Sequence, residues 1–548
     1  MRDVEREPEI RVRTPEGRIL ADYVTDAPAL RPFFNGNPDS LAAFRRKAAE
    51  VDRRFDRAGR EAMAEAIRPT SAGAERALRR VVEEDGLLVT TGQQAGAFSG
   101  PLYTIYKVLS AVRHARALED ALQRPVAPLF WVASEDHDWA EVDHAYVLDA
   151  NQELRHIPLD AGASGPPRSM ARRRLTAGLD DALGALTEVL PATAFTPLLI
   201  KQIRAAYRVG SSVAGAFTEL LASWLAPFDV LITDAASPPL KRLSIDVLAA
   251  EARGAEASER AVAGQTRALE ATGQRAQVAV LEGEANLFYE CETGRERLIR
   301  RGEFHEAVVA GRRWTSEELA AEIAAEPASF SPNVLLRPVV ETRVFPTVAY
   351  VAGPAELAYH AQLGCLFRLH GASMPIVVPR ASVQIVEPKV RRALERVRLE
   401  PDELVAPIHE LAMRLAREAL PDDVVARLAS LRGTIEAGFA ALAATAEPID
   451  PTLEGPLGRA GRAAEQEVDR AELKILRRLK ARNDVAMRSL RQSKMQLFPL
   501  DSPQERVLSA PTYLARYGPR FLERVLAALP EPRLDAEDRG AERCGADA

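Results

Sequence analysis

Cysteine and long apolar runs are both scarce in this sequence. Its 548 residues contain three cysteines, Cys291, Cys365 and Cys544, an odd number spread far apart, which argues against a disulfide framework and fits a reducing compartment. No apolar run approaches the ~20 residues of a membrane-spanning helix, and the amino terminus (MRDVEREPEIRVR) lacks the apolar core of a signal peptide. We therefore expect a cytoplasmic protein with no membrane partner.

A strong excess of one charge is also missing. The net charge is −6, whereas a general nucleic-acid-binding protein would normally be basic, so no nucleic-acid partner is expected. The one dense basic stretch, residues 168–174 (RSMARRR), is better interpreted as a solvated loop. With 47% hydrophobic and 27% charged residues the composition is that of a globular protein, and the length predicts two or three domains.

Several common catalytic and metal-binding patterns are absent. There is no Cys-x-x-Cys pair and no His/Cys cluster with ligand spacing, so no zinc and no metal ligands are predicted. The Gly-x-Ser-x-Gly nucleophile pattern, the dinucleotide fingerprint and the Walker pattern are missing too. Cys365 falls on a predicted helix, where a cysteine is more often a small core residue than a nucleophile.

Residues 87–144 have the pattern of a parallel α/β unit. An apolar run at 87–89 ends in a loop with three glycines, a helical segment follows from 101 to about 122, and a second apolar run covers 126–133. Polar residues follow both runs, at the strand ends where open α/β sheets bind their ligands. We therefore expect a functional site here.

The loop TGQQAG at 91–96 is the first candidate. A tight glycine loop before a helix lets backbone amides approach an anion, although a structural turn would also explain the glycines. Lys107 lies on the following helix beside Tyr103 and Tyr106; it could meet a phosphate or carboxylate, or be an ordinary surface lysine. The candidate residues of this region are Gly92, Gln93, Gln94, Gly96, Tyr106 and Lys107.

The segment Glu135-Asp136-His137-Asp138 is the densest ionisable cluster in the sequence. Adjacent carboxylates raise one another's pKa values and can orient an imidazole or bind a cation. The alternative is a solvated loop with a helix cap, which Asp supplies readily. We favour a functional cluster, to which His144 either belongs or is only a structural neighbour.

A third group of candidates lies in the second half of the chain. Glu356, near a helix start with Tyr359, could hold an ammonium group or a sugar hydroxyl, or could simply satisfy the helix dipole. Arg337 and Arg380 each lie beside a proline near a strand end, where a guanidinium can recognise an anion or pair with a carboxylate. Asn333, in the same segment as Arg337, completes the predicted substrate-binding residues.

The remaining patterns predict the domain organisation. We expect N-terminal helices and the first half of the core (1–150), a helical insertion (151–227), a core strand and helix (228–250), a second insertion (251–329), the second half of the core (330–386), an antiparallel coiled coil (387–497), a closing segment (498–530) and a disordered tail (531–548). Single helices are expected over about 40–67, 353–367 and 513–529. Heptad-like spacing predicts a coiled-coil seam at Val424, Leu428, Leu431, Ile435, Gly438 and Leu442, then at Leu457, Gly461, Ala464, Val468, Ala471 and Ile475.

Long motifs spread over most of the chain resemble one family. They are VTTGQQAGAFSGPLYTIYK, FWVASEDHDWAEVDH, NLFYE, FSPNVLLRPVVETRVFPTVAYVAGPAELAYHAQLG, MPIVVPR and SPQER, and they are similar to those of the cysteine-adding enzymes of bacillithiol biosynthesis. The resemblance implies an α/β, Rossmann-like parallel-sheet core related to class I aminoacyl-tRNA synthetases, two inserted connecting segments, and a C-terminal α-helical coiled coil that forms a homodimer. The synthetase signatures His-Ile-Gly-His and Lys-Met-Ser-Lys-Ser are absent.

The same resemblance implies a reaction, the joining of the carboxyl group of L-cysteine to the amino group of glucosaminyl-malate. Activation of the carboxylate implies ATP or another nucleotide, with or without Mg²⁺. His137 or a neighbouring carboxylate such as Asp136 would be the general base, and Lys107 would stabilise negative charge. The alternatives are a non-catalytic dimeric protein that binds a nucleotide or thiol, and a ligase of the same fold that uses another amine.

Overall fold

The computed structural model describes residues 7–13, 17–160, 165–482 and 484–536. The chain divides into a larger unit, Ile10–Gln384 with the described residues from Glu505 onward, and a smaller unit, Ile385–Gln504 with the described residues up to Glu9. Cys544 and most of the predicted tail, from 537 on, lie outside the described residues. No helix in the described ranges is long and apolar enough to cross a membrane.

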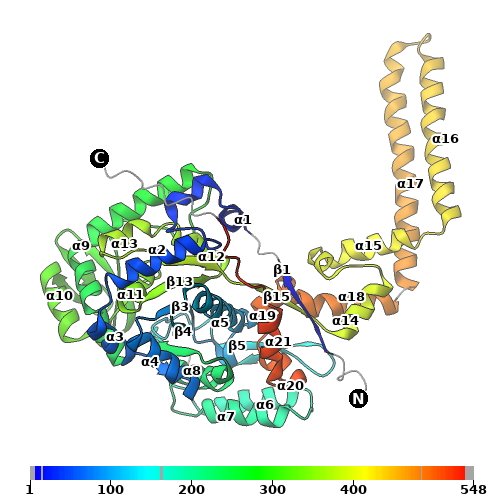
Figure 1. Cartoon of the computed structure of the whole chain (residues 1–548). Helices are drawn as coiled ribbons and strands as arrows, with labels where there is room; N and C mark the ends of the chain where they lie inside the picture. Colours follow the sequence, from blue (N-terminus) through cyan, green and yellow to red (C-terminus); the bar gives the residue numbers. More distant parts are fainter. Residues whose placement is uncertain (1–6, 14–16, 161–164, 483, 537–548) are drawn as a thin grey trace. The chain divides into compact units, whose positions relative to one another are not determined.

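A six-stranded sheet is the centre of the larger unit (Figure 1). Its strands, in spatial order, are β14 (Ile376–Pro379), β13 (Thr347–Ala352), β3 (Leu87–Gln93), β4 (Val126–Val132), β7 (Leu231–Asp234) and β2 (Arg68–Pro69). All neighbours are parallel except β2, which is antiparallel to β7. The predicted α/β class with a parallel sheet is confirmed.

Helices cover both faces of this sheet, which explains why the strands are almost continuously apolar. On one face, α2 (Leu41–Asp52) and α5 (Leu102–Leu122) pack against Leu87 and Val89. On the other face, Leu88 and Trp131 pack in a core shared with α4 (Ala72–Glu83), α9 (Pro238–Ala271) and α11 (Arg337–Val344). The alternation of Leu87, Leu88 and Val89 between the two cores follows from the two-residue period of a strand.

Two insertions separate the core strands. The first follows β4 and contains β5 (His144–Leu148), β6 (Leu154–Pro158), α6 (Leu179–Val189), α7 (Thr196–Ala206) and α8 (Val213–Leu225). The second contains a five-stranded sheet, in the order β11 (Arg312–Thr315), β10 (Phe304–Ala307), β9 (Gly294–Arg301), β8 (Glu284–Cys291) and β12 (Phe330–Pro332), followed in sequence after β11 by α10 (Ser316–Ala325). The sequence patterns missed β6 and α7.

Each of the three single helices predicted above is interrupted. The segment 40–67 forms α2 and α3 (Arg57–Ala64), because the Asp56 side chain accepts from the Gly59 amide and begins a new helix. The segment 353–367 forms α12 (Pro354–His360) and α13 (Gly364–Leu369). Between them, the backbone amides of Gln362 and Leu363 donate to the carbonyls three residues earlier, in place of the four-residue spacing of an α-helix. The closing segment forms α19 (Gln504–Val507), α20 (Pro511–Tyr517) and α21 (Arg520–Ala528), the last two separated by Gly518 at φ +70°.

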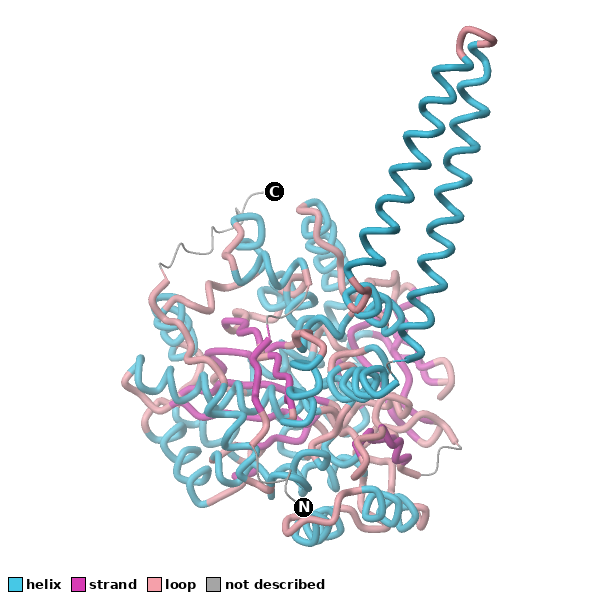
Figure 2. The backbone as a smooth tube through the Cα atoms, turned by 90° about the vertical axis from the view of Figure 1, so that its right-hand side faces the viewer, coloured by secondary structure: helices cyan, strands magenta, loops and turns pink. Residues whose placement is uncertain are grey.

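The smaller unit is helical. It contains α14 (Pro388–Arg396), α15 (Ile408–Glu418), α16 (Asp422–Ala446), α17 (Glu454–Arg482) and α18 (Asp484–Leu497). Figure 2 shows α16 and α17 as two long antiparallel helices joined by a short loop, as predicted. Outside these elements the chain also forms β1 (Glu9–Arg13), α1 (Arg18–Val24) and β15 (Ser382–Val386).

The seam between α16 and α17 follows the predicted heptads only in part: Gly461 and Val468 are buried as predicted, but other positions are not. Leu431 and Leu442 are 48% and 50% exposed, and Ile475 is 36% exposed, whereas Leu476 is fully buried. Phe439, next to the predicted Gly438, packs against Gly461 instead. A helix of 3.6 residues per turn drifts away from a strict seven-residue repeat, so the contact line moves by one residue along the hairpin.

Candidate active site

A cavity of about 560 Å³ opens at the carboxyl ends of β3, β4 and β13. Most of the predicted site residues line it, namely Gly92, Gln93, Gln94, Lys107, Glu135, Asp136, His137, Asn333, Arg337, Glu356, Tyr359 and Arg380. Three predicted residues, Gly96, Tyr106 and Asp138, do not line it. Gly96 lies so close to Gly100 that a Cβ atom at position 96 would be 2.7 Å from the Gly100 Cα. Tyr106 is fully buried and Asp138 is exposed to solvent. Tyr103 lines the cavity in place of Tyr106.

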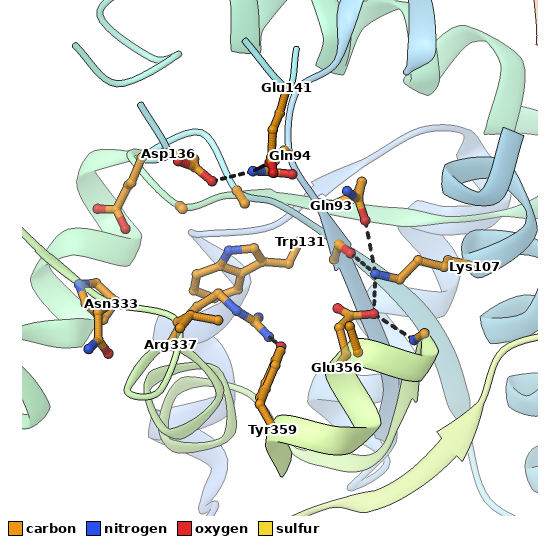
Figure 3. A pocket seen from close by; sticks show the side chains of 18 of the residues that line it. Gln93, Gln94, Lys107, Trp131, Asp136, Glu141, Asn333, Arg337, Glu356 and Tyr359 are labelled. Carbon is orange, nitrogen blue, oxygen red and sulfur yellow. Dashed lines mark hydrogen bonds and ion pairs between the residues drawn. The ribbon is translucent and has the colours of Figure 1, made fainter. Parts of the chain in front are cut away.

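Lys107 is bound to the protein itself (Figure 3). Its ammonium group lies 2.7 Å from a Glu356 carboxylate oxygen and donates to the Gly92 carbonyl and, at 3.2 Å, to Gln93 Oε1. Burial lowers the pKa of Lys107, and the Glu356 charge opposes that shift. The lysine therefore holds the end of β3 against the start of α12.

Glu356 accepts two further hydrogen bonds. The Tyr350 hydroxyl donates to one carboxylate oxygen and the Gly353 amide to the other, each at 2.7 Å. Burial alone would raise the pKa of Glu356, but Lys107 and these two donors outweigh it, so the pKa is lowered. Glu356 is thus an ionised carboxylate that is already fully partnered.

Gly96, at the end of the loop 91–96 that was expected to approach an anion, and three of the amides that follow it already have acceptors in the protein. Gly96 donates to the Gln94 carbonyl, Ala97 to the Val142 carbonyl, Phe98 to the Tyr207 hydroxyl and Gly100 to the Ala97 carbonyl, at 2.8 to 3.0 Å. These four amides are not free to cradle a ligand.

The acidic cluster separates into side chains with different partners. Glu135 pairs with Lys241, and burial raises its pKa in spite of that partner. Asp136 and Glu141 accept from the same Gln94 amide group, at 2.6 and 2.5 Å. His137 accepts from Arg295, with 2.8 Å between Nδ1 and Nη1.

Arg337 and Asn333 form the lower wall in Figure 3. Arg337 donates to the Tyr359 hydroxyl at 3.4 Å and to Glu341, and its guanidinium lies 5.8 Å from the centre of the Trp131 ring. Asn333 uses its side-chain oxygen to accept from the Leu335 and Leu336 amides. Asn333 therefore shapes the wall more than it offers a free polar group.

Arg380 is also paired. It forms a two-pronged ion pair with Glu505, at 2.7 and 3.0 Å, and Glu505 accepts in addition from Ser382 and from the Val383 amide. Arg506, the next residue after Glu505, is exposed and lines the cavity.

The sequence patterns missed Phe288, Arg295 and Arg297 of the second insertion, as well as Glu141 and Tyr350, all of which line the cavity. Phe288 lies in the motif NLFYE. This motif was the only sequence signal for the side of the cavity that the second insertion forms. No group of three His, Cys, Asp or Glu side chains in the described ranges is placed to hold a metal ion.

The fold and the cavity define a Rossmann-like protein with a charged candidate active site at the carboxyl ends of its parallel strands, together with a coiled-coil hairpin. Residues 8–381 match the family described as bacillithiol biosynthesis BshC, N-terminal Rossmann-like domain, and residues 383–535 match the C-terminal coiled-coil domain of BshC. The chain belongs to this family.

Relatives cover almost the whole chain. Three proteins named "Putative cysteine ligase BshC" come from Salinibacter ruber (31% identical, over 93% of this chain and 94% of the relative), Solibacter usitatus (33%, over 91% and 93%) and Geobacillus kaustophilus (31%, over 93% and 95%). The match therefore includes both units and both insertions.

Proposed function

We propose that this protein is a ligase that joins the carboxyl group of L-cysteine to the amino group of glucosaminyl-malate. Family membership supports the reaction class. The observation that carries the proposal is the presence of carboxylates and guanidinium groups in one cavity, Asp136 and Glu141 together with Arg295 and Arg297. The acceptor has an amine and the two carboxylates of malate, so it needs both kinds of partner.

Amide formation needs a deprotonated amine and a stabilised oxyanion. The carboxylates of Asp136 and Glu141, which both accept from Gln94, would bind the acceptor ammonium and receive its proton. The guanidinium group of Arg297 would bind a malate carboxylate. Trp131 and Phe288 supply apolar surface against the sugar ring or the cysteine side chain.

A free carboxylate does not react with an amine, so the cysteine carboxyl must be activated. ATP or another nucleotide would supply that activation, as an acyl-adenylate or acyl-phosphate, with Mg²⁺ as its counter-ion. The exposed Arg506 is the cation that fits its phosphates, because the Arg380 guanidinium is already held by Glu505.

We also propose that the protein is a homodimer through the coiled coil. Every residue of α16, all of which are described, is at least partly exposed, although the helix is rich in apolar side chains. Val425, Leu431 and Leu442 are each about half exposed. A second copy of the hairpin would bury them. Light scattering should give twice the monomer mass, and the double variant Leu431→Glu/Leu442→Glu should give the monomer mass.

Mass spectrometry of a reconstituted reaction tests the ligase proposal. Purified protein is incubated with L-cysteine, glucosaminyl-malate and each of several nucleotides, with L-serine in place of cysteine as a control. The cysteinyl amide should form with one nucleotide, and the double variant Asp136→Asn/Glu141→Gln should be strongly impaired. The proposal fails if no nucleotide yields the amide while the Geobacillus kaustophilus relative does so under the same conditions.

A further inference from the structure

The partner of His137 determines which of its ring nitrogens carries a hydrogen. Arg295 Nη1 lies 2.8 Å from His137 Nδ1. A guanidinium group has only donors and stays protonated, so Nδ1 must be the acceptor. The imidazole is then neutral with its hydrogen on Nε2. Nε2 makes no hydrogen bond with any residue that the structure describes, and His137 lines the cavity.

Arg295 is held firmly in this position. Its Nε and Nη2 donate to the Ser331 hydroxyl at 3.2 and 3.0 Å, and its guanidinium lies 3.7 Å from the centre of the Phe288 ring. The residue is 7% exposed. The His137 ring contacts the same Phe288, with 5.7 Å between ring centres. One aromatic side chain therefore supports both members of the pair.

The charged groups around His137 have opposite effects. Burial and the Arg295 charge lower its pKa, whereas Asp136, Asp138 and Glu290 raise it, and the net result is a lowered pKa. The nearest carboxylate oxygen, Asp136 Oδ1, lies 3.8 Å from Nδ1. The lowered pKa favours the neutral ring, in agreement with the hydrogen bond that Nδ1 accepts from Arg295.

We infer that Arg295 is a positioning residue that fixes His137 as a neutral donor through Nε2, and that His137 stabilises the reacting oxygen and is not the general base. This inference rests on the proposed ligase function. The amine nitrogen attacks the activated carbonyl carbon and the C=O π electrons move to the oxygen, which accepts the hydrogen bond from Nε2. When the carbonyl re-forms, the activating group leaves with its bonding pair, and the amine proton passes to the Asp136/Glu141 pair. His137 keeps its hydrogen throughout.

Two substitutions separate a donor from a base. Glutamine retains an N–H donor but cannot take up a proton, whereas alanine can do neither. We expect His137→Gln to keep kcat within about 10-fold of wild type and His137→Ala to lose about 10²-fold or more, as for an oxyanion-hole donor. The acidic limb of the pH profile of kcat/KM should persist in His137→Gln. Equal loss in both variants, or disappearance of that limb, would overturn the inference.

Nuclear magnetic resonance of ¹⁵N-histidine-labelled protein tests the Arg295 contact without any turnover. The His137 signals, assigned with His137→Gln, should be those of the Nε2–H tautomer in wild type. In Arg295→Met they should shift toward a tautomer mixture that protonates at higher pH, and Arg295→Lys should restore part of the wild-type behaviour. Arg297→Met, two residues along the same strand, should leave the His137 signals unchanged. A wild-type Nδ1–H tautomer, or no response to Arg295→Met, would refute the contact; failure of the ligase reaction alone would not alter these signals.

Discussion

The buried pair Lys107–Glu356 gives the most direct test of how the cavity is stabilised. The substitution Glu356→Gln removes the negative charge and leaves one amide oxygen, which can keep the hydrogen bond from Gly353 or the one from Tyr350 but not both, because these donors contact different carboxylate oxygens. The Lys107 side chain is only 2% exposed, so its ammonium group gains little hydration when the carboxylate charge is lost. Breaking a buried ion pair by changing one partner destabilises by about 3 to 5 kcal/mol, and we expect the lower end because Lys107 keeps two oxygen acceptors.

Thermal unfolding measures this loss. At about 2 cal/mol/K per residue, a unit of roughly 400 residues unfolds with an entropy of about 0.8 kcal/mol/K, so a loss of about 3 kcal/mol lowers Tm by about 4 °C. The exposed Glu188 provides the matched control, and Glu188→Gln should change Tm by less than about 1 °C. In a double-mutant cycle with Lys107→Met, the stability losses of the two single variants, Glu356→Gln and Lys107→Met, should sum to more than the loss measured for the double variant.

The same pair predicts a pH dependence. Because the pKa of Glu356 is lowered in the folded protein, its contribution to stability is full above the ordinary carboxyl pKa of 4.5 and is lost as the pH falls through the folded-state value. The Tm difference between wild type and Glu356→Gln should therefore be present at pH 7 and should disappear as the pH falls below 4.5. A Tm difference below about 1 °C at pH 7, or one that grows on acidification, would refute the reasoning.

Three further substitutions test other parts of the molecule. Gly96→Ala places a Cβ 2.7 Å from the Gly100 backbone, so the loop must shift, at a cost of about 1 to 3 kcal/mol of stability. We expect a lower kcat/KM in the ligase assay, and unchanged kinetics would contradict the close approach. Arg380→Lys loses the two-pronged contact with Glu505 and should destabilise by about 2 kcal/mol in urea unfolding; an unchanged midpoint would show that the pair is not formed. Asp56→Ala removes the cap of α3 and should destabilise by about 1 kcal/mol without changing turnover, and a loss of activity would mean that α3 positions the site.

Local sequence signals predicted the core elements around one cavity. The apolar runs at 87–89 and 126–133, the glycines between them and the proline before α5 all act over short distances, and β3, α5 and β4 follow them closely. Polar residues placed just after parallel strands had to lie at one edge of the sheet, so most of the predicted site residues share one cavity. The same patterns failed at 40–67, 353–367 and 513–529, because a new helix cap, a tight turn or a glycine interrupts the helix without removing the apolar periodicity.

What the residues do in the cavity depended on distant partners. The residues of the pair His137–Arg295 are 158 positions apart, and Lys107 meets a carboxylate supplied by α12. Sequence alone determined the α/β class, the strand ends that carry the site and the family. Only the tertiary structure decided that Lys107 is paired with Glu356 and that His137 Nδ1 faces Arg295, because protonation and hydrogen bonding depend on which side chains the fold brings within 3 Å.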